Sequence, residues 1–168
     1  MTGIKEITTG GRTGVTIVGT SANQVMDFST MVLDGIGLID AGAGNDTVTG
    51  GTGNDRLTGG AGADIFRLTA LTDSNLAGRD VVLGFSAAEG DKFDLSAIDA
   101  RPDLPGDQAF VFGGSGLVPL RGQITFIVIG GGTGAFIIGE TNGDGTPDFQ
   151  IELIGTGIAP FTEADFIL

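Results

Sequence analysis

The chain has 168 residues, enough for a single domain with a core of its own. Its 21 acidic and 8 basic side chains give a formal net charge of −13, which argues against nucleic acid or an anionic membrane as the main partner, because phosphate binding needs clustered Lys and Arg. It contains no His and no Cys, which excludes Ser-His-Asp and Cys-His catalysis, disulfide bonds and thiolate metal sites.

The first 31 residues predict short capping rungs. Strands are expected at 14–18 and 24–28, separated by a polar turn at 19–23. The apolar spacing joins the pattern that follows, which favours rungs over a loose terminus. Residues 1–10 hold no apolar core of signal-peptide length, and the longest apolar run, 124–129, is too short to span a bilayer. We therefore expect neither an N-terminal signal nor membrane insertion.

A nine-residue repeat occupies the segment 32–67. Three near-complete copies begin at Ala41, Gly50 and Gly59, with Gly at the second and fourth places, Asp at the sixth and a large apolar residue at the eighth. The copy beginning at Val32 is degenerate, because its sixth place is Gly37. Repeats of this length are typical of stacked, solenoid-like folds.

Each place in the repeat has a physical role. The last three residues form a short strand whose middle side chain points inward, and the first six turn, with glycine permitting conformations that other residues resist. Two turn-strand units make one coil of eighteen residues, so the turn at 50–55 should lie over 32–37 and the turn at 59–64 over 41–46. This would place Asp55 near Asp34 and stack Asp46 on Asp64.

Stacked turns of this kind surround a point with carboxylate and carbonyl oxygens. Such a flexible all-oxygen cage suits Ca²⁺ better than Mg²⁺. The alternative is a Gly-Asp-rich loop array without metal, which would stack unneutralised carboxylates in a poorly solvated turn at a cost in free energy.

The segment 68–168 predicts an all-β, sandwich-like cap. Strands are expected near 80–85, 91–96, 109–112, 123–129, 135–138, 149–154 and 166–168. The chain has eleven Phe but no Trp or Tyr, so the cap core should be packed by Phe. A cap is expected because an open roll end would expose an unpaired strand edge. The predicted fold class is therefore all-β, a parallel β-roll capped by a β-sandwich-like C-terminal part.

The repeat resembles the RTX (repeats-in-toxin) family, whose parallel β-roll binds Ca²⁺ in such turns. This resemblance implies several Ca²⁺ ions, held by carbonyls of the second- and fourth-place glycines and by carboxylates of the sixth-place aspartates: Gly42, Gly44, Asp46, Gly51, Gly53, Asp55, Gly60, Gly62 and Asp64. In the degenerate copy Asp34 and Gly35 would substitute.

Residues 32–168 also resemble the C-terminal domain of serralysin-type metalloproteases, in the segments 59–66, 80–85, 90–98, 107–110 and 148–168. In that family the domain follows a zinc protease domain and carries a C-terminal signal for type I secretion. The protease part is absent, since a chain without His cannot carry its zinc motif. By this resemblance Asp80 and Asp91 would hold one further Ca²⁺ at the cap junction; the alternative is that both are surface turn charges.

Two other motifs carry less weight. The segment 130–135 fits a dinucleotide-binding glycine pattern, but a strand is expected next where such a site needs a helix. The segment Glu140–Asp148 resembles the first nine positions of an EF-hand loop, yet Ile151 stands where a bidentate Glu is needed; a hairpin turn is the alternative.

The sequence therefore predicts a non-enzymatic, calcium-binding RTX module. We expect it to fold on Ca²⁺ binding, to direct the export of a fused passenger through a type I exporter that reads its C-terminus, and to be secreted by a bacterium without an N-terminal signal peptide. Two alternatives stay open at this point. One is a calcium-dependent adhesion module that binds an extracellular polysaccharide, and the other is an enzyme that uses paired carboxylates.

Overall fold

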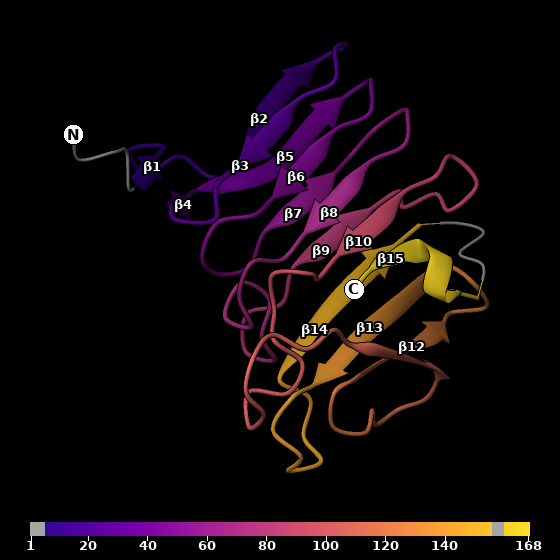
Figure 1. The fold of residues 1–168 in the computed structure, drawn as a ribbon. Helices are drawn as coiled ribbons and strands as arrows, with labels where there is room; N and C mark the ends of the chain where they lie inside the picture. Colours follow the sequence, from indigo (N-terminus) through magenta and orange to yellow (C-terminus); the bar gives the residue numbers. More distant parts are fainter. Residues whose placement is uncertain (1–5, 156–159) are drawn as a thin grey trace.

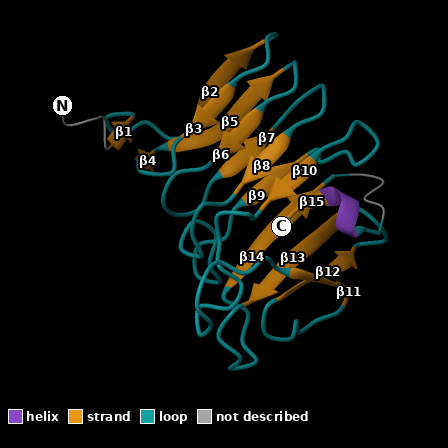
Figure 2. Ribbon diagram, in the orientation of Figure 1, coloured by secondary structure: helices purple, strands orange, loops and turns teal. Residues whose placement is uncertain are grey.

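The computed structural model describes residues 6–155 and 160–168. Parts of the predicted capping segments, residues 1–5 and 156–159, lie outside the described residues. The regular elements of the described chain are strands joined by loops and turns, with a single short 3₁₀ helix (Figure 2). The elements are β1 (Glu6–Thr8), β2 (Val15–Thr20), β3 (Val25–Asp27), β4 (Val32–Asp34), β5 (Ile36–Gly42), β6 (Thr47–Thr49), β7 (Arg56–Thr58), β8 (Ile65–Arg67), β9 (Val81–Leu83), β10 (Lys92–Asp94), β11 (Val111–Ser115), β12 (Gln123–Ile129), β13 (Gly134–Glu140), β14 (Phe149–Ile154), η1 (Glu163–Asp165) and β15 (Phe166–Ile167).

Successive strands of the repeat alternate between two sheets and so form a coil (Figure 1). β5, β7 and β9 are neighbours in an eight-stranded sheet, whereas β6, β8 and β10 are neighbours in a five-stranded sheet, and all of these pairs are parallel. The register pairs Ile39 with Leu57 and Val48 with Phe66, an offset of eighteen residues in each sheet. The parallel β-roll predicted from the repeat is confirmed.

The segment before the repeats forms a coil on the same axis. β2 pairs in parallel with β5, and β3 pairs in parallel with β6, so this segment adds one strand to each sheet. β1 pairs in parallel with β4 and forms a third, two-stranded sheet.

The C-terminal part extends the two sheets of the roll. β12, β13 and β14 are antiparallel, and β14 joins the roll by parallel pairing with β9. β15 joins the five-stranded sheet by parallel pairing with β10. The two layers of the cap are therefore continuous with the two layers of the roll, which gives this part of the molecule its sandwich character.

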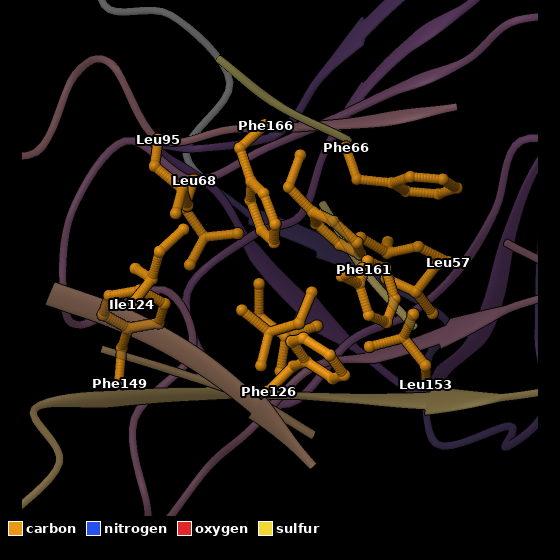
Figure 3. Packing of buried hydrophobic residues seen from close by; sticks show 14 of the residues in the cluster. Leu57, Phe66, Leu68, Leu95, Ile124, Phe126, Phe149, Leu153, Phe161 and Phe166 are labelled. Atoms are coloured by element: carbon orange, nitrogen blue, oxygen red, sulfur yellow. The ribbon is translucent and has the colours of Figure 1, made fainter. Parts of the chain in front are cut away.

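The core lies between the two sheets and runs from the roll into the cap. The eighth-place residues Val48, Leu57 and Phe66 are buried along the roll axis. Beyond them the filling is largely aromatic (Figure 3): the Phe166 ring centroid lies 6.1 Å from that of Phe93 and 6.0 Å from that of Phe161. The core of the cap is therefore packed by Phe side chains, as the sequence predicts.

In the described part of the chain, no helix has the length and apolar character needed to cross a membrane.

Candidate metal centre

The coil places its turns along two opposite edges of the roll (Figure 1). Turns 41–46, 59–64 and 84–91 follow strands of the eight-stranded sheet and form what we name the Asp46 edge. Turns 50–55 and 68–80 follow strands of the five-stranded sheet and form the Asp55 edge. Each edge therefore collects every second sixth-place aspartate.

Glycine lets neighbouring turns on the Asp46 edge approach closely. Ala61 N donates to Gly42 O at 3.1 Å, and Gly44 N donates to Ala61 O at 2.9 Å. A Cβ at Gly60 would collide with the Gly42 carbonyl, and a Cβ at Gly62 would collide with the Gly44 carbonyl. The turns can stack only because these positions carry no side chain.

Backbone conformation explains most of the predicted glycines, but not all of them. Positive φ angles that favour glycine occur at Gly42, Gly44, Gly53, Gly60 and Gly62. Gly51, in contrast, has no positive φ, and is needed because a Cβ there would lie 2.6 Å from the carbonyl oxygen of Met31.

Carboxylates form a hydrogen-bonded ladder along the Asp46 edge. Gln24 N donates to Asp46 Oδ1 at 2.7 Å, Asp46 N donates to Asp64 Oδ1 at 2.9 Å, and Asp64 N donates to Asp91 Oδ1 at 2.9 Å. The structure thus brings Asp46 and Asp64 onto adjacent turns in the order that the repeat predicts. One oxygen of each carboxylate accepts a backbone hydrogen bond, and this bond fixes the position of the other oxygen.

The second oxygen of each of these two aspartates lacks a partner. Asp46 Oδ2 and Asp64 Oδ2 are buried without a hydrogen bond, in residues that are 1% and 0% exposed. A buried charged acceptor left unpaired costs more than the about 1–3 kcal/mol of a neutral group. Burial raises the pKa of Asp64, and the negative charges of Asp46 and Glu89 raise it further. A cation bound at either of these oxygens would therefore stabilise the folded edge.

A hard cation fits these donors. The available groups are carboxylate and backbone carbonyl oxygens, which suit Ca²⁺. Within the described residues no three acidic side chains converge on one point. Each turn of the complete repeats offers one carboxylate, so backbone carbonyls and water would have to complete the coordination sphere of an ion bound there.

The Asp55 edge is satisfied differently. Asp55 N donates to Asp80 Oδ1 at 3.0 Å, while Asp55 Oδ2 accepts from Gly51 N at 2.8 Å. Burial raises the pKa of Asp80 to about 8, and the charges of Asp55 and Asp73 act in the same direction. Asp73, which the sequence did not single out, is buried there and accepts hydrogen bonds from Thr69 and Ala70.

Asp34 and Gly35 contact the N-terminal segment of the chain. Asp34 is exposed at the end of β4, where its Oδ2 accepts from Thr8 Oγ1 at 3.1 Å. The turn at 50–55 does stack on the degenerate copy, but through Thr52 N, which donates to Met31 O at 2.9 Å. Val32 and Thr52 form a parallel bridge, but no hydrogen bond joins Asp34 to Asp55 in the described part of the chain.

Asp80 and Asp91 are each buried, and each continues the ladder of its own edge. They follow different strands and lie on opposite edges, so the structure does not bring them together at one site. Burial raises the pKa of Asp91, but both of its oxygens accept backbone hydrogen bonds, from Asp64 N and Ser86 N.

The two remaining motifs form turns. Residues 130–133 turn directly into β13, a strand where a dinucleotide site needs a helix. Glu140–Asp148 joins β13 to the antiparallel β14 as a hairpin. Its carboxylates bond locally: Asp148 Oδ2 accepts from Thr141 N at 2.7 Å, and Glu140 Oε1 accepts from Asn142 N at 3.0 Å.

Sequence reasoning missed a row of asparagines beside the aspartates. Asn45 N donates to Asn23 Oδ1 at 2.8 Å, and Ala63 N donates to Asn45 Oδ1 at 3.1 Å. The signal was present in the fifth place of the repeat, which is Asn in the first two complete copies and Ala in the third. These amides fix the turn spacing without using any carboxylate.

Comparison with known proteins identifies the repeat. Residues 33–68 match the family model of the RTX calcium-binding nonapeptide repeat, in four copies. Four copies agree with the three near-complete repeats and the degenerate one. RTX nonapeptide repeats bind calcium, so the match supports calcium binding by the repeat segment of this chain. No curated protein sequence matches the chain.

Two solved structures share the fold over most of the chain. The AlgE6R3 subunit of the Azotobacter vinelandii mannuronan C5-epimerase matches with a TM-score of 0.59 and 24% identity, over 99% of this chain and 85% of that one. The AlgE6R2 subunit of the same enzyme matches with a TM-score of 0.53 and 24% identity, over 92% of this chain and 93% of that one. At this identity the likeness establishes the fold; an origin in a serralysin C-terminal domain is not among these findings.

Proposed function

We propose that this chain is a non-catalytic RTX module that folds when calcium binds outside the cell and that directs type I export of a protein fused to it. The observation that carries the calcium part is the pair of buried, unpartnered oxygens on the stacked turns, Asp46 Oδ2 and Asp64 Oδ2. They need a cation that the isolated chain does not supply.

Calcium binding and folding are expected to be one event. In the unfolded chain the sixth-place carboxylates are far apart and hydrated, whereas in the roll they are stacked and buried. A ligand that binds only the folded form stabilises it by RT ln(1 + [L]/Kd), about 2.7 kcal/mol per site at a hundred times Kd. Since native domains are stable by only about 5–15 kcal/mol, a few such sites decide whether the roll forms.

Chelation tests the calcium part. Circular dichroism of the chain in EDTA should show loss of the β signal, with recovery on addition of Ca²⁺ but not of equimolar Mg²⁺. A spectrum that does not change in EDTA would contradict coupled folding.

The export part rests on the resemblance and on the C-terminal sequence. The chain ends in Glu163–Leu168, in which the acidic Asp165 is followed by three apolar residues, and the resemblance locates an uncleaved signal there. In the folded protein this segment is η1 followed by β15, and Phe166 is buried. Export and packing are compatible, because an exporter reads the chain before it folds.

The structure also shapes the export experiment. A passenger fused ahead of residue 1 is expected in the medium of cells with a matching type I exporter, and deletion of Asp165–Leu168 is expected to abolish its export. Because that deletion also removes the buried Phe166, the matched control is Phe149→Ala, which damages the core and leaves the terminus intact. Equal export of the truncated and intact fusions would show that the terminus is only structural.

A further inference from the structure

The last turn on the Asp46 edge keeps the register of the repeat. The bond from Asp64 N to Asp91 Oδ1 repeats the bond from Asp46 N to Asp64 Oδ1, and both are 2.9 Å long. β10 pairs in parallel with β8, with Lys92 opposite Ile65. Counting back from the sixth-place aspartate therefore puts Glu89 in the fourth place.

Glu89 cannot present its backbone as the fourth-place glycines do. Gly44 and Gly62 have φ angles of 109° and 131°, a region that none of the described non-glycine residues occupies. The turn folds on itself instead, and Glu89 N donates to Ser86 O at 3.1 Å. The backbone carbonyl of Glu89 is therefore not presented as the carbonyl of a fourth-place glycine is in a regular turn.

The Glu89 side chain is exposed, and its carboxylate makes no hydrogen bond or ion pair with any residue in the described part of the chain. The turn that carries it lies directly on the turn of Asp64: a Cβ at Gly90 would be 3.2 Å from the Cβ of Ala63. The negative charge of Glu89 raises the pKa of both Asp64 and Asp91.

The hydrogen bonding of Asp64 and Asp91 is compatible with a ligand role for the Glu89 carboxylate. Asp64 is fully buried and its Oδ2 is unpartnered. Both oxygens of Asp91 already accept backbone hydrogen bonds. An ion held by Asp64 Oδ2 between this turn and the turn 84–91 would therefore face a turn without a fourth-place glycine, whose Asp91 already accepts two backbone hydrogen bonds.

We propose that Glu89 is a calcium ligand at the outer end of the Asp46 edge, where its carboxylate takes the place of the fourth-place backbone carbonyl of a regular turn. This inference rests on the proposed calcium function and deepens it. A site with two carboxylates, from Asp64 and Glu89, binds Ca²⁺ more tightly than a site with one, because affinity rises with ligand charge.

The test compares Glu89→Gln with Asp107→Asn in the full chain. Asp107→Asn removes the same charge from an exposed loop outside the repeats. Calcium titration calorimetry is expected to show one class of sites weakened at least about tenfold in Glu89→Gln, since even groups behind the ligands change metal affinity 10–100-fold. Europium luminescence lifetimes in H₂O and D₂O should report about one additional bound water per affected ion, because water replaces a lost carboxylate oxygen.

The outcomes separate this inference from the function on which it rests. Unchanged calcium affinity in Glu89→Gln, with affinity lost in Asp64→Ala, would overturn the ligand role and leave the calcium function intact. Weakening that disappears in about 1 M salt, with no added water, would also overturn it, because such an effect is long-range electrostatics. Unchanged binding in Asp64→Ala would instead contradict the proposed calcium function itself.

Discussion

The carboxylates of Asp46 and Asp55 differ in where their hydrogen bonds come from. Asp55 Oδ2 accepts from Gly51 N in its own turn. Asp46 Oδ1 accepts from Gln24 N in the preceding coil, and its Oδ2 is buried without a partner. Both residues occupy the sixth place of the repeat, so the repeat pattern alone does not distinguish the two arrangements.

Asp46→Asn is expected to lower calcium affinity by about tenfold or more, because it removes a charged ligand and preserves the acceptor for Gln24 N. The apparent Kd from calcium titration of the circular dichroism signal measures this. Asp107→Asn, a charge-matched control in an exposed loop, should behave as the native chain does. Equal effects of the two changes would mean that net charge, rather than the turn register, sets the affinity.

The glycines allow conformational strain to be separated from steric collision. Gly53 and Gly62 have φ angles of 113° and 131°, but a Cβ at Gly53 would meet open space whereas one at Gly62 would meet the Gly44 carbonyl. We expect Gly53→Ala to cost about 1–3 kcal/mol of unfolding free energy in saturating Ca²⁺, from backbone strain. Gly62→Ala should cost more, because a backbone carbonyl cannot move aside. Urea unfolding measures both, and equal losses would contradict the close stacking of the turns.

At the scale of elements, the predictable part of the fold is the part that repeats. The nine-residue spacing fixed the eighteen-residue coil and the inward direction of Val48, Leu57 and Phe66, because each rung buries the same face of the same short strand. The cap strands were also located from apolar runs between turns. Their pairing was not predictable, because whether a strand extends an existing sheet or starts another depends on distant partners.

The site was predictable to a similar extent. The aspartates and glycines of the complete copies could be named from the sequence because their places recur. The bond of Asp34 to Thr8, the separation of Asp80 from Asp91 and the role of Asn45 depend on which edge a turn occupies and on what lies over it. No local sequence pattern predicts these contacts between turns.

The last strand carries a stability role that can be measured apart from export. Phe166 is 7% exposed, and its ring centroid lies 5.5 Å from that of Phe112 as well as near Phe93 and Phe161. Phe166→Ala should therefore lower the unfolding free energy by about 3–5 kcal/mol. Ile167→Ala, which alters the more exposed neighbour in the same strand, should cost less. A loss at Ile167 as large as that at Phe166 would contradict the packing described for β15.

At the scale of the whole molecule, protonation of Asp80 should make stability depend on pH. The pKa of this carboxyl is about 8 in the folded chain, against about 3.9 for an ordinary Asp in an unfolded chain. Between these values the folded state holds one more proton, so raising the pH favours the unfolded state. In saturating Ca²⁺ the unfolding free energy is expected to fall from pH 5 to pH 8.5.

The variant Asp80→Asn should flatten this fall, because an amide does not titrate. Urea unfolding of both chains across the pH range measures the difference. A slope unchanged by the substitution would assign the titration to other groups. A native chain that is no less stable at pH 8.5 than at pH 5 would instead show that a cation keeps Asp80 ionised in the folded protein, as the family resemblance implies.

The alternation of turns between two edges makes the length of this molecule adjustable in fixed steps. An inserted pair of repeats, eighteen residues, would add one strand to each sheet and lengthen the roll by one strand spacing, about 4.8 Å, with every later aspartate still on its own edge. A single inserted repeat would move each later turn to the opposite edge and exchange the sheets that receive the cap strands. Gene duplication can therefore lengthen this roll only in even numbers of repeats, because an odd number breaks the parity that the cap requires.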